Sequence, residues 1–181
     1  MLASPHPIAA VSDRGVHRLR RSQLVRRPRR EVFAFFADAS NLEAITPDFL
    51  RFRIATPLPI RMAEGTLVEY RLKLFGVPFG WTTRIEAWQP ERRFVDVQLR
   101  GPYRLWRHTH EFLDASEGTL VVDSVDYALP LDPLSRVVHA AFVRRAVERI
   151  FDHRRERIEA LLAPRPAPQP ADSGPEPEGA A

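Results

Sequence analysis

The sequence contains no cysteine and only one lysine, Lys73, among its 181 residues. The absence of cysteine excludes disulfide bonds, a thiolate nucleophile and any cysteine-ligated zinc or iron–sulfur site, so stability must come from packing. No apolar run approaches the roughly 20 residues that a membrane-spanning helix needs, and the first residues lack the long apolar core of a secretory signal. We therefore expect a cytoplasmic protein with no integral membrane association.

The common hydrolase, nucleotide-binding and zinc-protease motifs are also missing from the sequence. The formal net charge of +4 rests on arginines that are spread along the chain. The arginine-rich stretch 18–30 could dock an acidic protein, a membrane surface or nucleic acid. Because these arginines interleave with a predicted strand and helix and lack an array of base-stacking aromatic residues, we expect a solvated surface and no nucleic-acid partner.

The length favours one hydrophobic core with tails. Residues 1–15 are predicted to be a flexible extension, 16–163 the folded domain, and 164–181 a disordered tail, because that last stretch is rich in proline and has almost nothing to bury. Within the domain, a first strand is predicted over 16–25. Two short helices follow, the first from Pro28 and the second from a capping box formed by Ser40 and Glu43.

The middle of the chain alternates apolar and polar residues, as β-strands do. Six further strands are predicted, over 49–56, 66–75, 79–88, 93–99, 104–113 and 119–129. Most connections are short and contain glycine or proline, which favours antiparallel hairpins. After Pro130 the pattern becomes helical, with Asp132 as the N-cap and Pro133 at the first position, and it continues to Ala163.

The predicted fold class is therefore α+β: a curved antiparallel sheet of about seven strands wrapped around a long C-terminal helix, with two short helices after the first strand. One helix cannot cover the whole apolar face of such a sheet. We expect an apolar gap with a few polar groups beneath it, of the kind that binds small molecules.

Several motifs mark a family resemblance. They are Val32-Phe33-x-Phe35-Phe36-x-Asp38, Leu42-x-x-Ile45-Thr46-Pro47, Gly101-Pro102-Tyr103-x-x-Trp106-x-His108-x-His110-x-Phe112 and Asp123-x-x-Asp126-Tyr127-x-Leu129-Pro130. With the order of elements, they resemble the SRPBCC superfamily of START-like lipid carriers, pollen-allergen-type binders and polyketide cyclases, and in particular its bacterial ligand-binding branch. The resemblance implies the helix-grip fold and a cavity for a small hydrophobic ligand such as a lipid, polyketide or aromatic metabolite. A binder without cofactor is expected, and a polyketide cyclase or aromatase is the alternative.

The strand 104–113 carries the residues best suited to chemistry. Trp106, His108, His110 and Phe112 share one face, and the aromatic brackets indicate the cavity side. The two imidazoles could satisfy neighbouring strands, orient a polar ligand group, act as general acid or base, or bind a metal ion. Imidazoles two residues apart need further ligands for a metal site, and none is evident from the spacing, so no metal site is predicted.

The neighbouring strand 93–99 can present either of two faces. The cavity is lined either by Val95, Val97 and Leu99 or by Phe94, Asp96 and Gln98. A two-residue reversal at Gly101-Pro102 would set Val95 opposite His108, and a three-residue reversal or a bulge would set Phe94 there. The family resemblance favours Asp96 and Gln98 in the cavity wall, with a solvated outer face as the alternative.

On the last strand, Asp123 and Tyr127 share a face while Asp126 takes the other, so at most one of the two carboxylates should serve the cavity. A carboxylate beside an imidazole would hold one tautomer and raise its pKa, although a structural role is expected of both. The full predicted ligand-binding set is Tyr70, Leu72, Trp81, Thr83, Ile85, Phe94, Asp96, Gln98, Trp106, His108, His110, Phe112, Tyr127 and Phe142.

Overall fold

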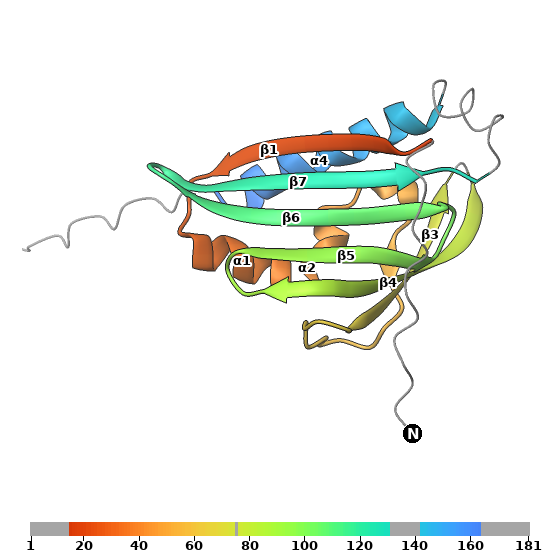
Figure 1. Ribbon diagram of the computed structural model, residues 1–181, viewed down its shortest axis with the longest axis horizontal. Coiled ribbons are helices and arrows are strands. Elements are labelled where there is room, and N and C mark those ends of the chain that lie inside the picture. Colours follow the sequence, from red (N-terminus) through yellow and green to blue (C-terminus); the bar gives the residue numbers. More distant parts are fainter. Residues whose placement is uncertain (1–14, 75, 131–141, 164–181) are drawn as a thin grey trace, which may run out of the picture.

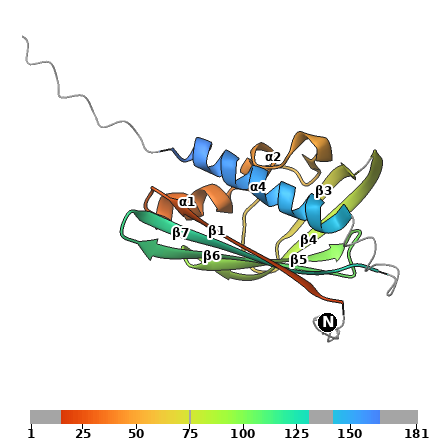
Figure 2. The same ribbon diagram turned by 90° about the horizontal axis from the view of Figure 1, so that it is seen from above.

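The computed structural model describes residues 15–74, 76–130 and 142–163 (Figure 1). In chain order the elements are β1 His17–Val25, α1 Arg29–Ala37, α2 Asn41–Ala44, the 3₁₀ helix η1 Asp48–Leu50, β2 Arg53–Ile54, β3 Leu67–Leu74, β4 Val77–Gln89, β5 Arg93–Arg100, β6 Leu105–Ala115, β7 Gly118–Ala128 and α4 Arg144–Leu161. The strands form one curved antiparallel sheet in the order β1-β7-β6-β5-β4-β3-β2. Figure 2 shows that α4 crosses one face of this sheet, with α1 and α2 on the same side. The predicted fold class is confirmed.

Two local predictions early in the chain are wrong. The stretch 49–56 is not a strand, because it contains η1 and the two-residue β2, separated by Arg51 in the left-handed region at φ 45°. Ser40 does not cap α2, since its hydroxyl donates to Asp38 Oδ1 at 2.6 Å. Glu43 instead accepts the backbone N–H of Ile54 at 2.9 Å, so its carboxylate ties α2 to β2.

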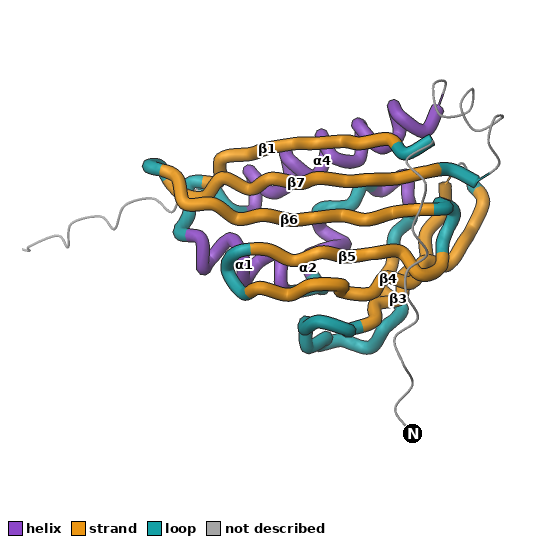
Figure 3. The backbone as a smooth tube through the Cα atoms, in the orientation of Figure 1, coloured by secondary structure: helices purple, strands orange, loops and turns teal. Residues whose placement is uncertain are grey.

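The sheet brings its first strand beside its last one (Figure 3). β1 pairs with β7 from His17 opposite Tyr127 to Val25 opposite Thr119. Gly118 makes this pairing possible, because it has φ +142° and a Cβ there would lie 2.3 Å from the carbonyl oxygen of Val25. Only glycine fits such a backbone position without moving a neighbouring chain.

Two hydrophobic clusters pack between the sheet and the helices. The first joins α1 to β5, β6 and β7 through Val25, Val32, Phe33, Phe36, Ile45, Phe94, Phe112, Val121 and Ile158. The second joins β1, β7 and α4 through Leu19, Val125, Tyr127, Val147 and Phe151. The two predicted cavity histidines lie between them, since His110 is 5.9 Å from the Phe36 ring centre and His108 is 5.3 Å from that of Phe151.

The C-terminal helix contacts the sheet through Val147, Phe151 and Ile158, which have the spacing of one helical face. Leu161, at the end of α4, is exposed. The predicted helix start at Asp132 and Pro133 lies outside the described residues. Within the described ranges, no helix is both long and apolar enough to cross a membrane.

Candidate functional site

A cavity of about 210 Å³ lies between the concave face of the sheet and the helices. Most of the residues predicted from the sequence lie against it: Tyr70, Leu72, Trp81, Thr83, Ile85, Phe94, Asp96, Trp106, His108 and His110. They come from four consecutive strands of the sheet, β3 to β6. Alternation along each strand put them on one face, as the sequence pattern indicated.

The remaining walls come from segments that sequence reasoning assigned to plain core or left out. They include Phe35, Leu42, Ile45, Phe52, Met62, Tyr103, Ala146, Ile150 and Arg154. Arg154 had a readable signal: it falls three residues after Phe151 and four before Ile158, within the apolar stripe of α4. A charged residue on a buried helical face needs a reason for being there.

Four predicted ligand-binding residues lie outside the lining. Phe112 and Tyr127 are buried in the two hydrophobic clusters and pack behind the cavity wall. Phe142, which lies in a π-helical turn just before α4, is 61% exposed. These three side chains therefore do not line the cavity.

The fourth residue, Gln98, stabilises the loop between β5 and β6 through its side chain. Its Nε2 donates to the carbonyl of Tyr103 at 2.7 Å, and Gly101 passes so close that a Cβ there would lie 2.3 Å from Gln98 Oε1. This folded loop sets Tyr103 against Trp81 and Trp106, with ring centres 4.8 to 5.7 Å apart. One end of the cavity is therefore an aromatic wall.

The polar end of the cavity depends on the register between β5, β6 and β7. Asp96 lies opposite His108, and Phe94 lies opposite His110. Neither predicted register is right, because Asp96 and not Val95 or Phe94 lies opposite His108. The two strands pair with each other as far as Val97 and Arg107, and residues 101–104 connect them. On the other side His110 lies opposite Asp123. The prediction that Asp96 faces the cavity is confirmed, and Asp126 turns to the outer face to pair with Arg18.

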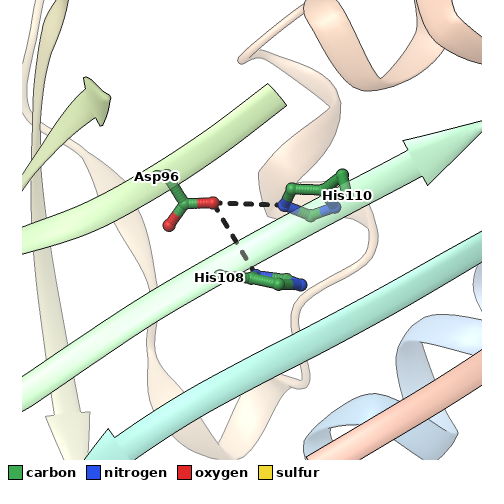
Figure 4. Close-up of side chains that lie close together, drawn as sticks. All are labelled: Asp96, His108 and His110. Atoms are coloured by element: carbon green, nitrogen blue, oxygen red, sulfur yellow. Dashed lines mark hydrogen bonds and ion pairs between the residues drawn. The ribbon is translucent and has the colours of Figure 1, made fainter. Parts of the chain in front are cut away.

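Asp96, His108, His110 and Asp123, here called the Asp–His cluster, form a closed ring of contacts. His108 Nε2 lies 3.0 Å from Asp123 Oδ1, and His110 Nε2 lies 3.1 Å from Asp96 Oδ2. His108 Nδ1 lies 3.7 Å from the same Asp96 oxygen (Figure 4). His110 Nδ1 lies 2.7 Å from Asp123 Oδ1 but at an angle that leaves this buried nitrogen without a hydrogen bond.

Apolar surfaces enclose the Asp–His cluster. His110 stacks on Phe94 with ring centres 4.1 Å apart, and the two imidazole centres are 3.7 Å apart. Arg154 reaches the cavity from α4, with its guanidinium carbon 5.5 Å from the centre of the Phe36 ring. Its Nε is buried without a hydrogen-bond partner among the described residues. One cationic side chain therefore faces the cavity beside two carboxylates.

The contacts within the cluster separate the pKa values of its members. Burial alone would keep Asp123 protonated, but the neighbouring His110 and His108 hold the pKa of this carboxyl well below its usual range. Burial likewise opposes ionisation of Asp96, and its hydrogen bond with His110 brings the pKa below the ordinary value.

The two histidines shift in opposite directions. Burial disfavours a charged His110, yet the charge of Asp123 and the close contacts with both carboxylates raise its pKa. Burial and the adjacent His110 lower the pKa of His108. The geometry thus favours an imidazolium at His110, clamped between two carboxylates, beside a neutral His108. Burial, reinforced by Asp96, also raises the pKa of Tyr70, which faces the same space as a neutral phenol.

The curved sheet wraps around the C-terminal helix and leaves an apolar cavity between them. This architecture is that of helix-grip proteins, which bind ligands in such a cavity. The family model described as "Polyketide cyclase / dehydrase and lipid transport" matches residues 16–163. The chain belongs to this family, and the resemblance to the SRPBCC superfamily is confirmed. Membership supports hydrophobic-ligand binding as the general function.

Solved structures share the fold at low sequence identity. TTHA0849 from Thermus thermophilus is 21% identical with a TM-score of 0.59, over 81% of this chain and 100% of that one. CV1439 from Chromobacterium violaceum is 14% identical with a TM-score of 0.63, over 82% and 98%. Ginseng major latex-like protein 151 from Panax ginseng is 16% identical with a TM-score of 0.57, over 82% and 99%. No curated protein matched the sequence.

Proposed function

We propose that the protein binds a compact hydrophobic molecule, such as an aromatic or polyketide-like metabolite, whose polar group meets the Asp–His cluster and Arg154. The observation that carries this proposal is the cavity of about 210 Å³ with mainly apolar walls, into which Asp96, His108, His110 and Arg154 bring charged and hydrogen-bonding groups. An apolar cavity of about 150 Å³ accepts benzene, so this space suits a ring-sized ligand better than a long acyl chain.

The walls favour a flat, apolar guest. Trp81, Tyr103 and Trp106 present ring faces and edges at one end, and the indole N–H of Trp81 is already bonded to Thr83 Oγ1 at 2.9 Å. Stacking on such rings stabilises an aromatic ligand beyond simple burial. Arg154 and the phenol of Tyr70, which also line the cavity, can donate hydrogen bonds to a carbonyl or carboxylate.

Filling the cavity should abolish binding. Ala146 lines the cavity from α4, whereas Ala160 is exposed on the same helix, so Ala146→Phe and Ala160→Phe form a matched pair. We expect saturable fluorescence enhancement of anilinonaphthalenesulfonate with the wild type and with Ala160→Phe, and its loss with Ala146→Phe. Native mass spectrometry of the purified protein would identify a retained ligand. Equal dye binding by both variants would place the ligand elsewhere.

A second function, general acid–base catalysis on the bound molecule, is favoured by the contact of His110 with two carboxylates. Such a histidine can hold and return a proton beside an enolisable carbonyl, as a cyclase or aromatase requires. We expect His110→Asn and His108→Asn to abolish loss of water from a β-hydroxy ketone while dye binding persists. Unchanged turnover in both variants would leave binding as the whole function.

A further inference from the structure

Three potential metal-ligating atoms converge at the polar end of the cavity, one each from Asp96, His108 and His110. All of them lie within 4.8 Å of one another. The spacing of the histidines along β6 offered only two ligands, and the β5–β6 register supplies the third by setting Asp96 opposite His108. Figure 4 shows the carboxylate directed at both imidazoles.

Two of the three ligand separations fit one ion. With bonds of about 2.1 Å, ligand atoms around a metal lie roughly 3.0 Å apart at octahedral angles and roughly 3.4 Å apart at tetrahedral angles. Asp96 Oδ2 lies 3.1 Å from His110 Nε2 and 3.7 Å from His108 Nδ1. The two imidazole nitrogens lie within 4.8 Å of each other, so these rings would approach each other around a shared ion.

Asp123 orients the imidazoles for this role. A carboxylate can only accept, so His108 Nε2 donates the 3.0 Å bond to Asp123, and the lone pair of a neutral His108 is then on Nδ1, facing Asp96. His110 Nδ1 also lies beside Asp123, which leaves Nε2 directed at Asp96. A histidine that ligates a metal through one nitrogen usually gives its other N–H to such a carboxylate.

The surroundings leave room for a second molecule on the ion. Asp96, His108 and His110 all line the cavity, so coordination positions not filled by protein would open into it. The side chains of both histidines are at most 5% exposed, and Asp96 is at 18%. In the metal-free protein the His110 imidazolium and Arg154 offset the two buried carboxylates, and a bound cation would replace the proton on His110 Nε2.

We propose that Asp96, His108 and His110 bind one divalent transition-metal ion at the polar end of the cavity, with Asp123 as the positioning residue for both imidazoles. Two nitrogens and one carboxylate oxygen are the donor set that zinc and iron(II) sites with open positions use. A carbonyl or carboxylate of a bound ligand would occupy an open position, and the ion would act there as a Lewis acid.

Metal binding can be measured without any organic ligand, so its failure is separate from failure of the cavity proposal. The full-length, untagged protein is stripped with a chelator and titrated with Zn²⁺ against a chromophoric chelator. We expect one ion per chain. Asp96→Asn should weaken binding by more than the ~10–100-fold expected of Asp123→Asn, because the first loses a ligand and the second only its support. His153→Asn, on the outer side of α4, is the matched control and should bind as the wild type does.

A measurement on the wild-type protein tests the proposal even if the variants do not fold. In long-range proton–nitrogen correlation spectra, Zn²⁺ should leave His108 protonated on Nε2 and bound through Nδ1, and His110 protonated on Nδ1 and bound through Nε2. No stoichiometric binding, equal affinity for wild type and Asp96→Asn, or shifts confined to His153 would each overturn the proposal.

Discussion

Replacing Asp123 by asparagine tests the internal electrostatics of the Asp–His cluster. Asp123 contacts His108 at 3.0 Å and His110 at 2.7 Å, and its side chain is only 12% exposed. The amide keeps the shape and can still accept from His108, but it removes the charge that offsets the His110 imidazolium. Breaking a buried pair by removing one partner costs about 3–5 kcal/mol. Because the asparagine keeps one hydrogen bond, we expect the low end, about 3 kcal/mol at neutral pH.

The pH dependence follows from two shifts of opposite kind. The pKa of Asp123 is lower in the folded protein than in the unfolded chain, so its contribution is complete above about pH 4 and is lost as pH falls through the folded value. The pKa of His110 is higher in the folded protein, so its contribution is complete below about pH 6.5 and is lost as pH rises through the folded value. The stability gap between wild type and Asp123→Asn should therefore be widest between these limits.

The assay is urea unfolding followed by tryptophan fluorescence, with a chelator present so that metal binding does not contribute. The free energy of unfolding is compared at pH values below 4, between 4 and 6.5, and in the alkaline range. The pKa of His108 is lowered by burial and by His110 and raised in part by Asp123, so removing this carboxylate lowers it further and adds to the gap below about pH 6.5. A gap that does not change with pH, or a variant as stable as the wild type at neutral pH, would refute the charged arrangement.

Three further substitutions test the frame around the cavity. Gly118→Ala should cost well over the ~1 kcal/mol expected of Gly65→Ala in urea unfolding, because Gly65 has open space around it while Gly118 meets the Val25 carbonyl. Phe142→Ser should change the unfolding free energy by less than about 0.5 kcal/mol and leave dye affinity unchanged, since this ring is exposed. Arg154→Met should weaken binding of the anionic dye anilinonaphthalenesulfonate by about tenfold while sparing its uncharged analogue phenylnaphthylamine, a loss of about 1.4 kcal/mol in competition titrations.

The faces of the strands could be predicted because alternation is a property of the backbone. The sequence pattern placed His108 and His110 on one side of β6, and nothing in the fold could separate them. The partner of His108 could not be predicted in the same way, since it depends on how far β5 and β6 continue before they reverse. The pairing between β5 and β6 ends at Val97. The next residue, Gln98, donates a side-chain hydrogen bond to the carbonyl of Tyr103 and packs against Gly101.

The residues that line the cavity from the helices could not be predicted, for a different reason. Phe36 and Phe35 are neighbours on α1, and one packs in the first hydrophobic cluster while both reach the cavity lining. A helical pattern reveals an apolar face but does not distinguish a neighbour side chain from empty space. Arg154 was the exception, because an arginine between Phe151 and Ile158 breaks the pattern and marks where packing gives way to polar contact.

The Asp–His cluster adds less to the fold than its burial suggests. Apolar side chains of similar size would hold β5, β6 and β7 together at least as well, because a buried ion pair rarely exceeds a hydrophobic replacement in stability. The sheet around the cluster is already covered by Phe94, Phe112 and Val125. A ring of four ionisable side chains in that position is therefore better explained by the cavity that it borders than by the sheet that supports it. His110 touches both carboxylates and stacks on Phe94 in the cavity wall, so we expect binding, proton transfer or metal coordination to act through this residue.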